Sequence, residues 1–310
     1  MGWSNSEYWI HHSHYYYQII FFNLPKSLPL LDKLFTGGKT QLDELASKHA
    51  NDYQKGEPFP NIYFEDFFNP EFLDEVLAEF PDLSSRNTIH YENPFEKKFA
   101  GRGEQDFGPS TREFMHFLNS EPFLQFLQKL TGIEELLISD PYYIGGGQHE
   151  IKQGGLLKIH VDFNKHPKLG LDRRLNVLVY LNKDWQEEYG GHFELWNDTM
   201  DKCVKKILPK FNTLAIFSTN NISYHGHPDP LNCPDHMSRK SLALYYYTNG
   251  RPQHEVQNHS HSTLFAERKN HPEEHSTFVK LRATNRLKNI MRSILPEKWI
   301  AAIKPKSKDW

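Results

Sequence analysis

Residues 158–163 read KIHVDF, a short run in which apolar and polar side chains alternate. Alternation of this kind predicts a β-strand, in which every second side chain points to the same face. His160 and Asp162 stand two residues apart and would therefore face the same way. The sequence thus predicts a strand whose imidazole and carboxylate can both bind one metal ion.

Two further histidines follow this strand at a distance. His225 and His227 come after residues 211–218, an apolar run that predicts a buried strand. Because they stand two apart, both would share a face of an extended segment, and either could be the third ligand. Two histidines and one carboxylate on one face of a metal leave the opposite positions open, which is the arrangement of non-haem Fe(II) oxygenases.

An anion-binding group lies further along the chain. Arg239 and Ser241 open a run rich in apolar and tyrosine residues that predicts a strand, so both would face one side and Lys240 the other. A guanidinium can bind a carboxylate through two parallel hydrogen bonds. The structural alternative is an exposed Arg239 at a strand end, paired with Asp235.

The order His-x-Asp, distant His and Arg-x-Ser resembles that of the Fe(II)/2-oxoglutarate-dependent dioxygenase superfamily, and most closely its bacterial prolyl 4-hydroxylase-type branch. The likeness extends over residues 140–250. Residues 174–182 and 189–195 resemble the paired central strands of that branch, with a turn and a Gly-Gly between them. The resemblance implies a mainly β fold with flanking helices, whose core is a double-stranded β-helix, or jelly roll.

The resemblance also implies a metal site. His160, Asp162 and His225 would bind Fe(II) and form the catalytic centre. His225 is favoured over His227 because the superfamily's ligand histidine commonly closes a short turn after a buried strand and precedes a small residue, here Gly226. His227 would then support the ligands or face the substrate.

A co-substrate site is implied in the same way. Arg239, helped by the hydroxyl of Ser241, would bind the far carboxylate of 2-oxoglutarate. A tyrosine would add a hydrogen bond to that carboxylate, and the sequence does not choose among the three candidates, Tyr142, Tyr143 and Tyr180.

The implied reaction uses dioxygen, 2-oxoglutarate and Fe(II), with ascorbate as an optional reductant, and releases succinate and carbon dioxide. Hydroxylation of a substrate carbon is favoured, because the related halogenases lack the carboxylate that Asp162 supplies. A prolyl residue, a sugar or another small metabolite would be the substrate. The contrasting function is a non-catalytic metal-binding jelly roll, a cupin-like sensor or sugar-binding module, which would not need the Arg239 and Ser241 pair.

The 310 residues, 38% of them hydrophobic, are enough for one catalytic core with extensions. We expect an aromatic N-terminal arm and a short helix in residues 1–55, and a strand with supporting helices in residues 56–135. The catalytic core would span residues 136–252, and a basic C-terminal extension residues 253–310.

Local signals predict several elements around this core. Asn69 before Pro70 is a helix start, and Ser120 and Gly132 would bound another helix. Residues 110–113 form a capping box by pattern. Residues 84–108 are predicted to be a polar surface loop, and the functional alternative is a lid over the active site. The histidine-rich residues 259–261 and 271–275 are predicted to be solvated loops.

Charge and cysteine content limit the binding partners and the compartment that we expect. A formal charge of −3 gives no electrostatic reason to expect nucleic acid or a membrane surface as a partner. Cys203 and Cys233 are too few for a disulfide framework, and no signal peptide or apolar run of about 18–20 residues is present. We therefore expect a cytoplasmic protein, whose oligomeric state the sequence leaves open.

Overall fold

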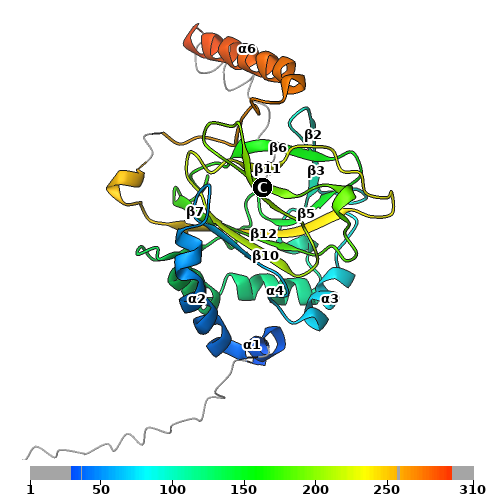
Figure 1. Cartoon of the computed structure of the whole chain (residues 1–310), viewed down its shortest axis with the longest axis vertical. Coiled ribbons are helices and arrows are strands. Elements are labelled where there is room, and N and C mark those ends of the chain that lie inside the picture. The colour runs from blue at the N-terminus through cyan, green and yellow to red at the C-terminus, as the bar shows by residue number, and fades with distance from the viewer. Residues whose placement is uncertain (1–28, 36, 257–258, 295–310) are drawn as a thin grey trace, which may run out of the picture.

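The computed structural model describes residues 29–35, 37–256 and 259–294, which form a β-barrel with short helices on one side and a long helix at the other (Figure 1). The aromatic stretch of the predicted N-terminal arm lies outside these residues. None of the helices in the described ranges combines the length and the apolar character needed to cross a membrane.

The barrel has two halves. In one half, called the β7 half, the strand order is β1–β10–β7–β12–β5. In the other half, called the β6 half, the order is β6–β11–β8–β9. Strand β3 pairs with both β5 and β6 and so joins the halves. The strands are β1 (Asn61–Phe64), β3 (Glu96–Ala100), β5 (Gly147–Ile151), β6 (Leu156–Val161), β7 (Asp172–Tyr180), β8 (Phe193–Trp196), β9 (Cys203–Ile207), β10 (Thr213–Ser218), β11 (His225–His227) and β12 (Arg239–Thr248). Neighbouring strands run antiparallel, and the predicted double-stranded β-helix is confirmed.

One predicted pairing is wrong. The two segments expected to be paired central strands became β7 and β8, which lie in different halves. Strand β7 pairs with β10 and β12, whereas β8 pairs with β11 and β9. The Gly-Gly turn before β8 therefore carries the chain from one half of the barrel to the other, which nearness in sequence could not reveal.

Strand β7 shows why the barrel has two different faces. Its side chains alternate, so Leu175, Val177 and Val179 point outward into the main hydrophobic cluster. Asn176 and Tyr180 point the other way and line a pocket inside the barrel. The outer face thus stabilises the fold, and the inner face carries polar groups.

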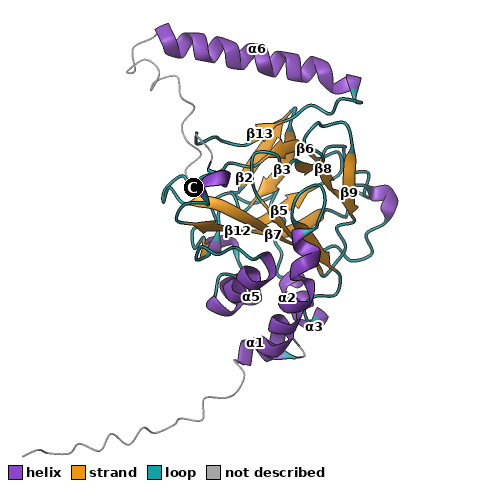
Figure 2. Cartoon of the chain, turned by 60° about the vertical axis from the view of Figure 1, so that its left-hand side comes forward, coloured by secondary structure: helices purple, strands orange, loops and turns teal. Residues whose placement is uncertain are grey.

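Helices cover the outer face of the β7 half (Figure 2). Phenylalanines dominate this layer, and Phe35, Phe72, Phe114 and Phe126 are each at most 2% exposed. Burial of one such side chain contributes roughly 1.5–3 kcal/mol. The helices are α1 (Pro29–Leu34), α2 (Gly38–Gln54), α3 (Pro70–Ala78), α4 (Pro109–Leu118) and α5 (Glu121–Thr131).

The predicted ends of α3 and α5 are confirmed. Asn69 caps α3, its side chain accepting a hydrogen bond from the Glu71 backbone N–H, with Pro70 in the first turn. Helix α5 starts after Ser120 and ends at Gly132, whose φ of 67° is the left-handed conformation that glycine adopts without strain.

The predicted capping box at residues 110–113 is wrong. The cap residue of α4 is Gly108, and the first turn is capped from outside by Glu79, at the end of α3. The Glu79 carboxylate accepts hydrogen bonds from the backbone N–H groups of Ser110 and Thr111, at 3.0 and 2.9 Å. A carboxylate from another helix has therefore replaced the local side chain, and its negative charge suits a helix N-terminus.

Residues 84–108 are more ordered than the predicted loop. They contain β2 (Ile89–Asn93), which forms a hairpin with β3. The Asn93 side chain accepts hydrogen bonds from the backbone N–H groups of Phe95 and Glu96 at its turn. Both strands carry mostly polar side chains, so the apolar alternation that marks a strand is weak. The hairpin adds to the barrel rather than lying over it as a separate loop.

The histidine-rich stretch at residues 271–275 is not the predicted solvated loop. It begins α6 (Pro272–Ile294), a long helix outside the barrel (Figure 1). Glu274 is 3% exposed because it pairs with Lys158 on β6 and with Arg268. The other elements are β4 (Ile138–Ser139), β13 (Leu264–Phe265) and the 3-10 helices η1 (Glu104–Asp106), η2 (Glu187–Tyr189) and η3 (Gln253–Glu255).

Candidate active site

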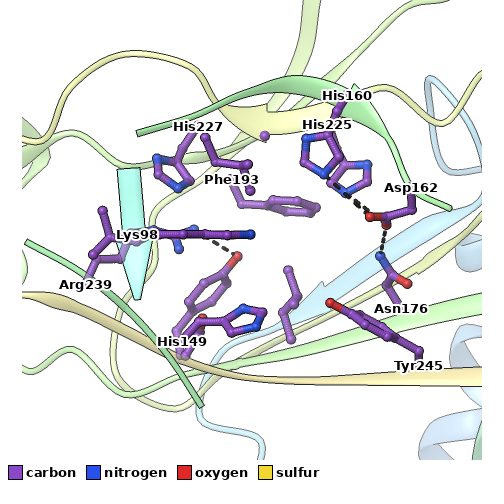
Figure 3. Close-up of a pocket in the computed structure, with 16 residues that line it drawn as sticks. Lys98, His149, His160, Asp162, Asn176, Phe193, His225, His227, Arg239 and Tyr245 are labelled. Atoms are coloured by element: carbon purple, nitrogen blue, oxygen red, sulfur yellow. Dashed lines mark hydrogen bonds and ion pairs between the residues drawn. The ribbon is translucent and has the colours of Figure 1, made fainter. Parts of the chain in front are cut away.

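Adjacent strands bring three predicted metal ligands together. His160 lies near the end of β6, Asp162 directly after it, and His225 begins β11 opposite His160. One ligand atom from each of these three residues lies within 4.8 Å of the others. Figure 3 shows them grouped on one side of the pocket. The structure thus places His225, and not His227, beside Asp162.

Backbone carbonyls orient both imidazoles. The Nδ1 atoms of His160 and His225 lie 2.8 Å from the carbonyl oxygens of Lys158 and Ser223. A carbonyl can only accept, so each Nδ1 carries the hydrogen and leaves Nε2 unprotonated in the neutral ring. The two Nε2 atoms lie 3.5 and 3.3 Å from the carboxylate oxygens of Asp162. The Nε2 lone pairs of His160 and His225 therefore both point toward the space beside the Asp162 carboxylate.

Two residues of β7 support Asp162. The Asn176 side-chain amide donates a hydrogen bond of 2.6 Å to Asp162 Oδ2, and Arg173 Nη2 lies 3.0 Å from the same oxygen. Arg173 is fully buried, with its guanidinium carbon 3.4 Å from the ring centroid of Tyr245. Burial alone would raise the pKa of Asp162, but Arg173 and His225 hold it well below its ordinary value. The carboxylate is therefore ionised.

This donor set fits Fe(II). Two imidazole nitrogens and one carboxylate oxygen suit a non-haem Fe(II) ion and leave other coordination positions open. Burial and the neighbouring His225 lower the pKa of His160, so its ring stays neutral as a metal ligand requires. The sequence predicted these three residues, but it missed Arg173 and Asn176. Strand alternation places Asn176 inward, yet gives no sign that it contacts Asp162.

The other side of the pocket is cationic. Arg239 is 4% exposed; its Nε donates to the Gly191 carbonyl at 2.8 Å, and its Nη2 donates to the Tyr180 hydroxyl at 3.2 Å. Glycine is needed at position 191, because its φ of 68° is left-handed and a Cβ there would lie only 3.0 Å from Arg239 Cδ. Ser241 lines the same pocket. The structural alternative, an exposed Arg239 paired with Asp235, is therefore wrong, because Arg239 is buried and makes its contacts inside the pocket.

The structure distinguishes the three candidate tyrosines. Tyr142 is 55% exposed, and Tyr143 packs edge to face with Phe107. Tyr180 lines the pocket beside Arg239, and burial raises its pKa, which keeps its hydroxyl protonated. Because the Tyr180 oxygen accepts from Arg239, its own O–H can be donated to a ligand.

Two further residues reach the pocket. His227, at the end of β11, lies on the Arg239 side, and Lys98 enters from β3 (Figure 3). Lys98 could not be placed from the sequence, since its strand read as a loop. The pocket therefore has a ligand set for a cation on one side, and on the other side arginine, lysine and histidine groups that suit an anion.

Comparison with known proteins agrees with this geometry. Residues 147–247 match the model of the 2OG-Fe(II) oxygenase superfamily. A prolyl 3-hydroxylase of Xenopus laevis is 25% identical over 175 residues, which are 54% of this chain and 31% of that protein. The chain thus spans less than a third of that relative's length.

Solved structures of two prolyl hydroxylases are similar to this chain. One, from Trichoplax adhaerens in complex with a hypoxia inducible factor peptide, is 18% identical with a TM-score of 0.49, covering 67% of this chain and 91% of that one. A prolyl-4-hydroxylase of Pseudomonas putida is 13% identical with a TM-score of 0.47, covering 66% and 100%. Residues 147–247, which match the model of the 2OG-Fe(II) oxygenase superfamily, hold the two histidines, the aspartate and the arginine described above.

Proposed function

We propose that this protein is an Fe(II)- and 2-oxoglutarate-dependent dioxygenase that hydroxylates an unactivated carbon of an organic substrate. The observation that carries the proposal is that the His160, Asp162 and His225 cluster and the buried Arg239 line one pocket. 2-Oxoglutarate has a 2-oxo acid group to chelate a metal and a second carboxylate to meet a guanidinium. A pocket with both complementary ends suits that molecule.

In this proposal His160, Asp162 and His225 hold Fe(II). With dioxygen and 2-oxoglutarate bound, the metal supplies the oxidative chemistry that inserts one oxygen atom into a C–H bond and yields succinate and carbon dioxide. Arg173 and Asn176 hold Asp162 ionised and in place through contacts of 3.0 and 2.6 Å. Asp162 therefore needs no deprotonation before the metal binds.

Arg239 would fix the far carboxylate of 2-oxoglutarate. Its bonds to Gly191 and Tyr180 use two of the five N–H groups of the guanidinium and lock its orientation. Tyr180 and Ser241 line the same side and can donate their hydroxyl hydrogens to that carboxylate. Apolar side chains such as Leu157, Leu178 and Phe193 complete the wall and limit water near the reacting groups.

The substrate that we propose is a prolyl residue, with a sugar or another small metabolite as the other candidates. The named activity of the Xenopus laevis relative, which is 25% identical over the matched segment, supports the prolyl residue. Ascorbate would serve as an optional reductant. The cytoplasm is the compartment we propose, because Cys203 and Cys233 form no disulfide.

Anaerobic titration of the Fe(II)-loaded protein with 2-oxoglutarate tests this function. Bidentate chelation should produce a weak visible charge-transfer band, which His160→Ala should abolish because one ligand is lost. Succinate release with candidate substrates would follow. A protein that binds iron but gives no band would contradict the proposal and favour the non-catalytic metal-binding jelly roll.

A further inference from the structure

Two histidines of one short strand face different parts of the pocket. His225 lies opposite His160 of β6, whereas His227 lies opposite Leu157, because the register shifts between them. Gly226 permits this close pairing, since a Cβ there would lie only 2.7 Å from the Leu157 carbonyl oxygen. As a result His227 lies on the Arg239 side of the pocket (Figure 3).

His227 differs from the other pocket histidines in its hydrogen bonds. His160, His225 and His149 each place one ring nitrogen within 3.1 Å of a backbone carbonyl oxygen. His227 is 3% exposed, and neither of its ring nitrogens has a hydrogen-bond partner among the residues that the structure describes. Burying an imidazole without partners is unfavourable, so the arrangement points to a partner that a ligand supplies.

The charges around His227 define that ligand. Lys98 and Arg239 line the same part of the pocket. An imidazole carries at least one N–H to donate, and beside two cations an anion is the acceptor that its surroundings favour.

We propose that His227 is a further 2-oxoglutarate-binding residue, which donates a hydrogen bond to the far carboxylate that Arg239 also binds. This inference rests on the proposed function. The two carboxylate oxygens offer about four lone-pair sites, enough for a guanidinium, a hydroxyl and an imidazole N–H together. Binding would give the ring nitrogen its missing partner, so His227 would contribute to selection of a 2-oxo acid with a second carboxylate.

The test compares two ligands on two proteins. Wild type and His227→Phe, loaded with Fe(II) without oxygen, are titrated with 2-oxoglutarate and with 2-oxovalerate, a 2-oxo acid of equal chain length without the far carboxylate. We expect His227→Phe to raise the Kd of 2-oxoglutarate about tenfold, the scale of one hydrogen bond to a charged group. The Kd values of 2-oxovalerate and Fe(II) should change less than twofold.

A 2-oxoglutarate Kd within twofold of wild type would overturn the inference, and so would an equal rise for both ligands, which indicates a packing role. Should His227→Phe not fold, His227→Asn and His227→Gln allow the same comparison. Each supplies an amide NH2 donor near the place of a different ring nitrogen, Asn for Nδ1 and Gln for Nε2, so one of the two should restore near wild-type affinity. If wild type itself gives no band with either ligand, the proposed function fails instead.

Discussion

The two ends of the pocket handle their charges in opposite ways. At the metal end, Asp162 contacts Arg173, Asn176 and both ligand histidines, so its negative charge is compensated within the protein. At the other end, the hydrogen bonds of Arg239 within the described part of the chain go to two neutral groups, a carbonyl and a phenol. The first end is assembled before any ligand arrives, whereas the second has positive charge to offer to an anion.

This difference predicts that a substitution at one end of the pocket should leave ligand binding at the other end unchanged. Loss of a residue at the metal end removes a ligand or its support, while loss of a residue at the cationic end removes affinity for a carboxylate. Three substitutions test this separation, in order of decreasing effect on ligand binding.

Arg239→Ala should have the largest effect. It removes the buried guanidinium, and we expect the Kd of 2-oxoglutarate to rise about 100-fold, since truncating one partner of a buried charge pair costs roughly 2–5 kcal/mol. Fe(II) affinity, measured by anaerobic titration, should stay within threefold. Lys240→Ala is the matched control, because that side chain faces the other side of β12. Equal losses of iron and 2-oxoglutarate would contradict the separation.

Asn176→Ala should weaken the metal end alone. Loss of the 2.6 Å hydrogen bond to Asp162 leaves the carboxylate less well oriented. Removal of a group that supports a metal ligand typically lowers metal affinity about 10–100-fold, and we expect the lower value because Arg173 remains. Val177→Ala, on the outer face of β7, should lower stability without changing the iron Kd. An unchanged iron Kd in Asn176→Ala would contradict this prediction and show that Arg173 alone is enough to orient Asp162.

Glu274→Gln should leave both ligand affinities within twofold but lower stability. Glu274 is buried with Lys158 and Arg268, and losing its charge should cost about 2 kcal/mol in the free energy of unfolding. Burial alone would raise the pKa of Glu274, yet these two cations lower it below its ordinary value. The ionised carboxylate therefore stabilises the fold above the unfolded pKa, and this contribution is lost as pH falls through the folded pKa.

Denaturant unfolding at several pH values checks that prediction. The difference in the free energy of unfolding between wild type and Glu274→Gln should be largest at pH 7. It should shrink below about pH 4, where the unfolded glutamate takes up a proton. Glu273→Gln, on the exposed neighbouring residue, should have little effect. A difference that persists unchanged at pH 3 would exclude the ion pairs as its cause.

Local patterns predicted much of this molecule. The alternation around His160 and Asp162 placed both on one face, and the caps at Asn69 and Gly132 were found because a cap depends on residues a few positions away. The fold followed from the resemblance that these motifs carry rather than from strand patterns alone.

Contacts between distant segments could not be predicted. The choice of Tyr180 beside Arg239 depends on the pairing of β7 with β12, and Glu79 caps a helix that starts 30 residues later. The separation of His225 from His227 depends on a register shift against β6. Residue spacing contains no information on such contacts, because they are fixed only when the strands and helices pack.

The outer edge of β6 has a consequence for the order in which the site is completed. On that edge Leu156 and Leu157 pair with β3, and His160 and Val161 pair with β13. Both partners lie outside residues 147–247, one before and one after. During synthesis the ligand strand would therefore keep an open edge until residue 265 has left the ribosome, so the metal site is among the last parts of the barrel to be finished.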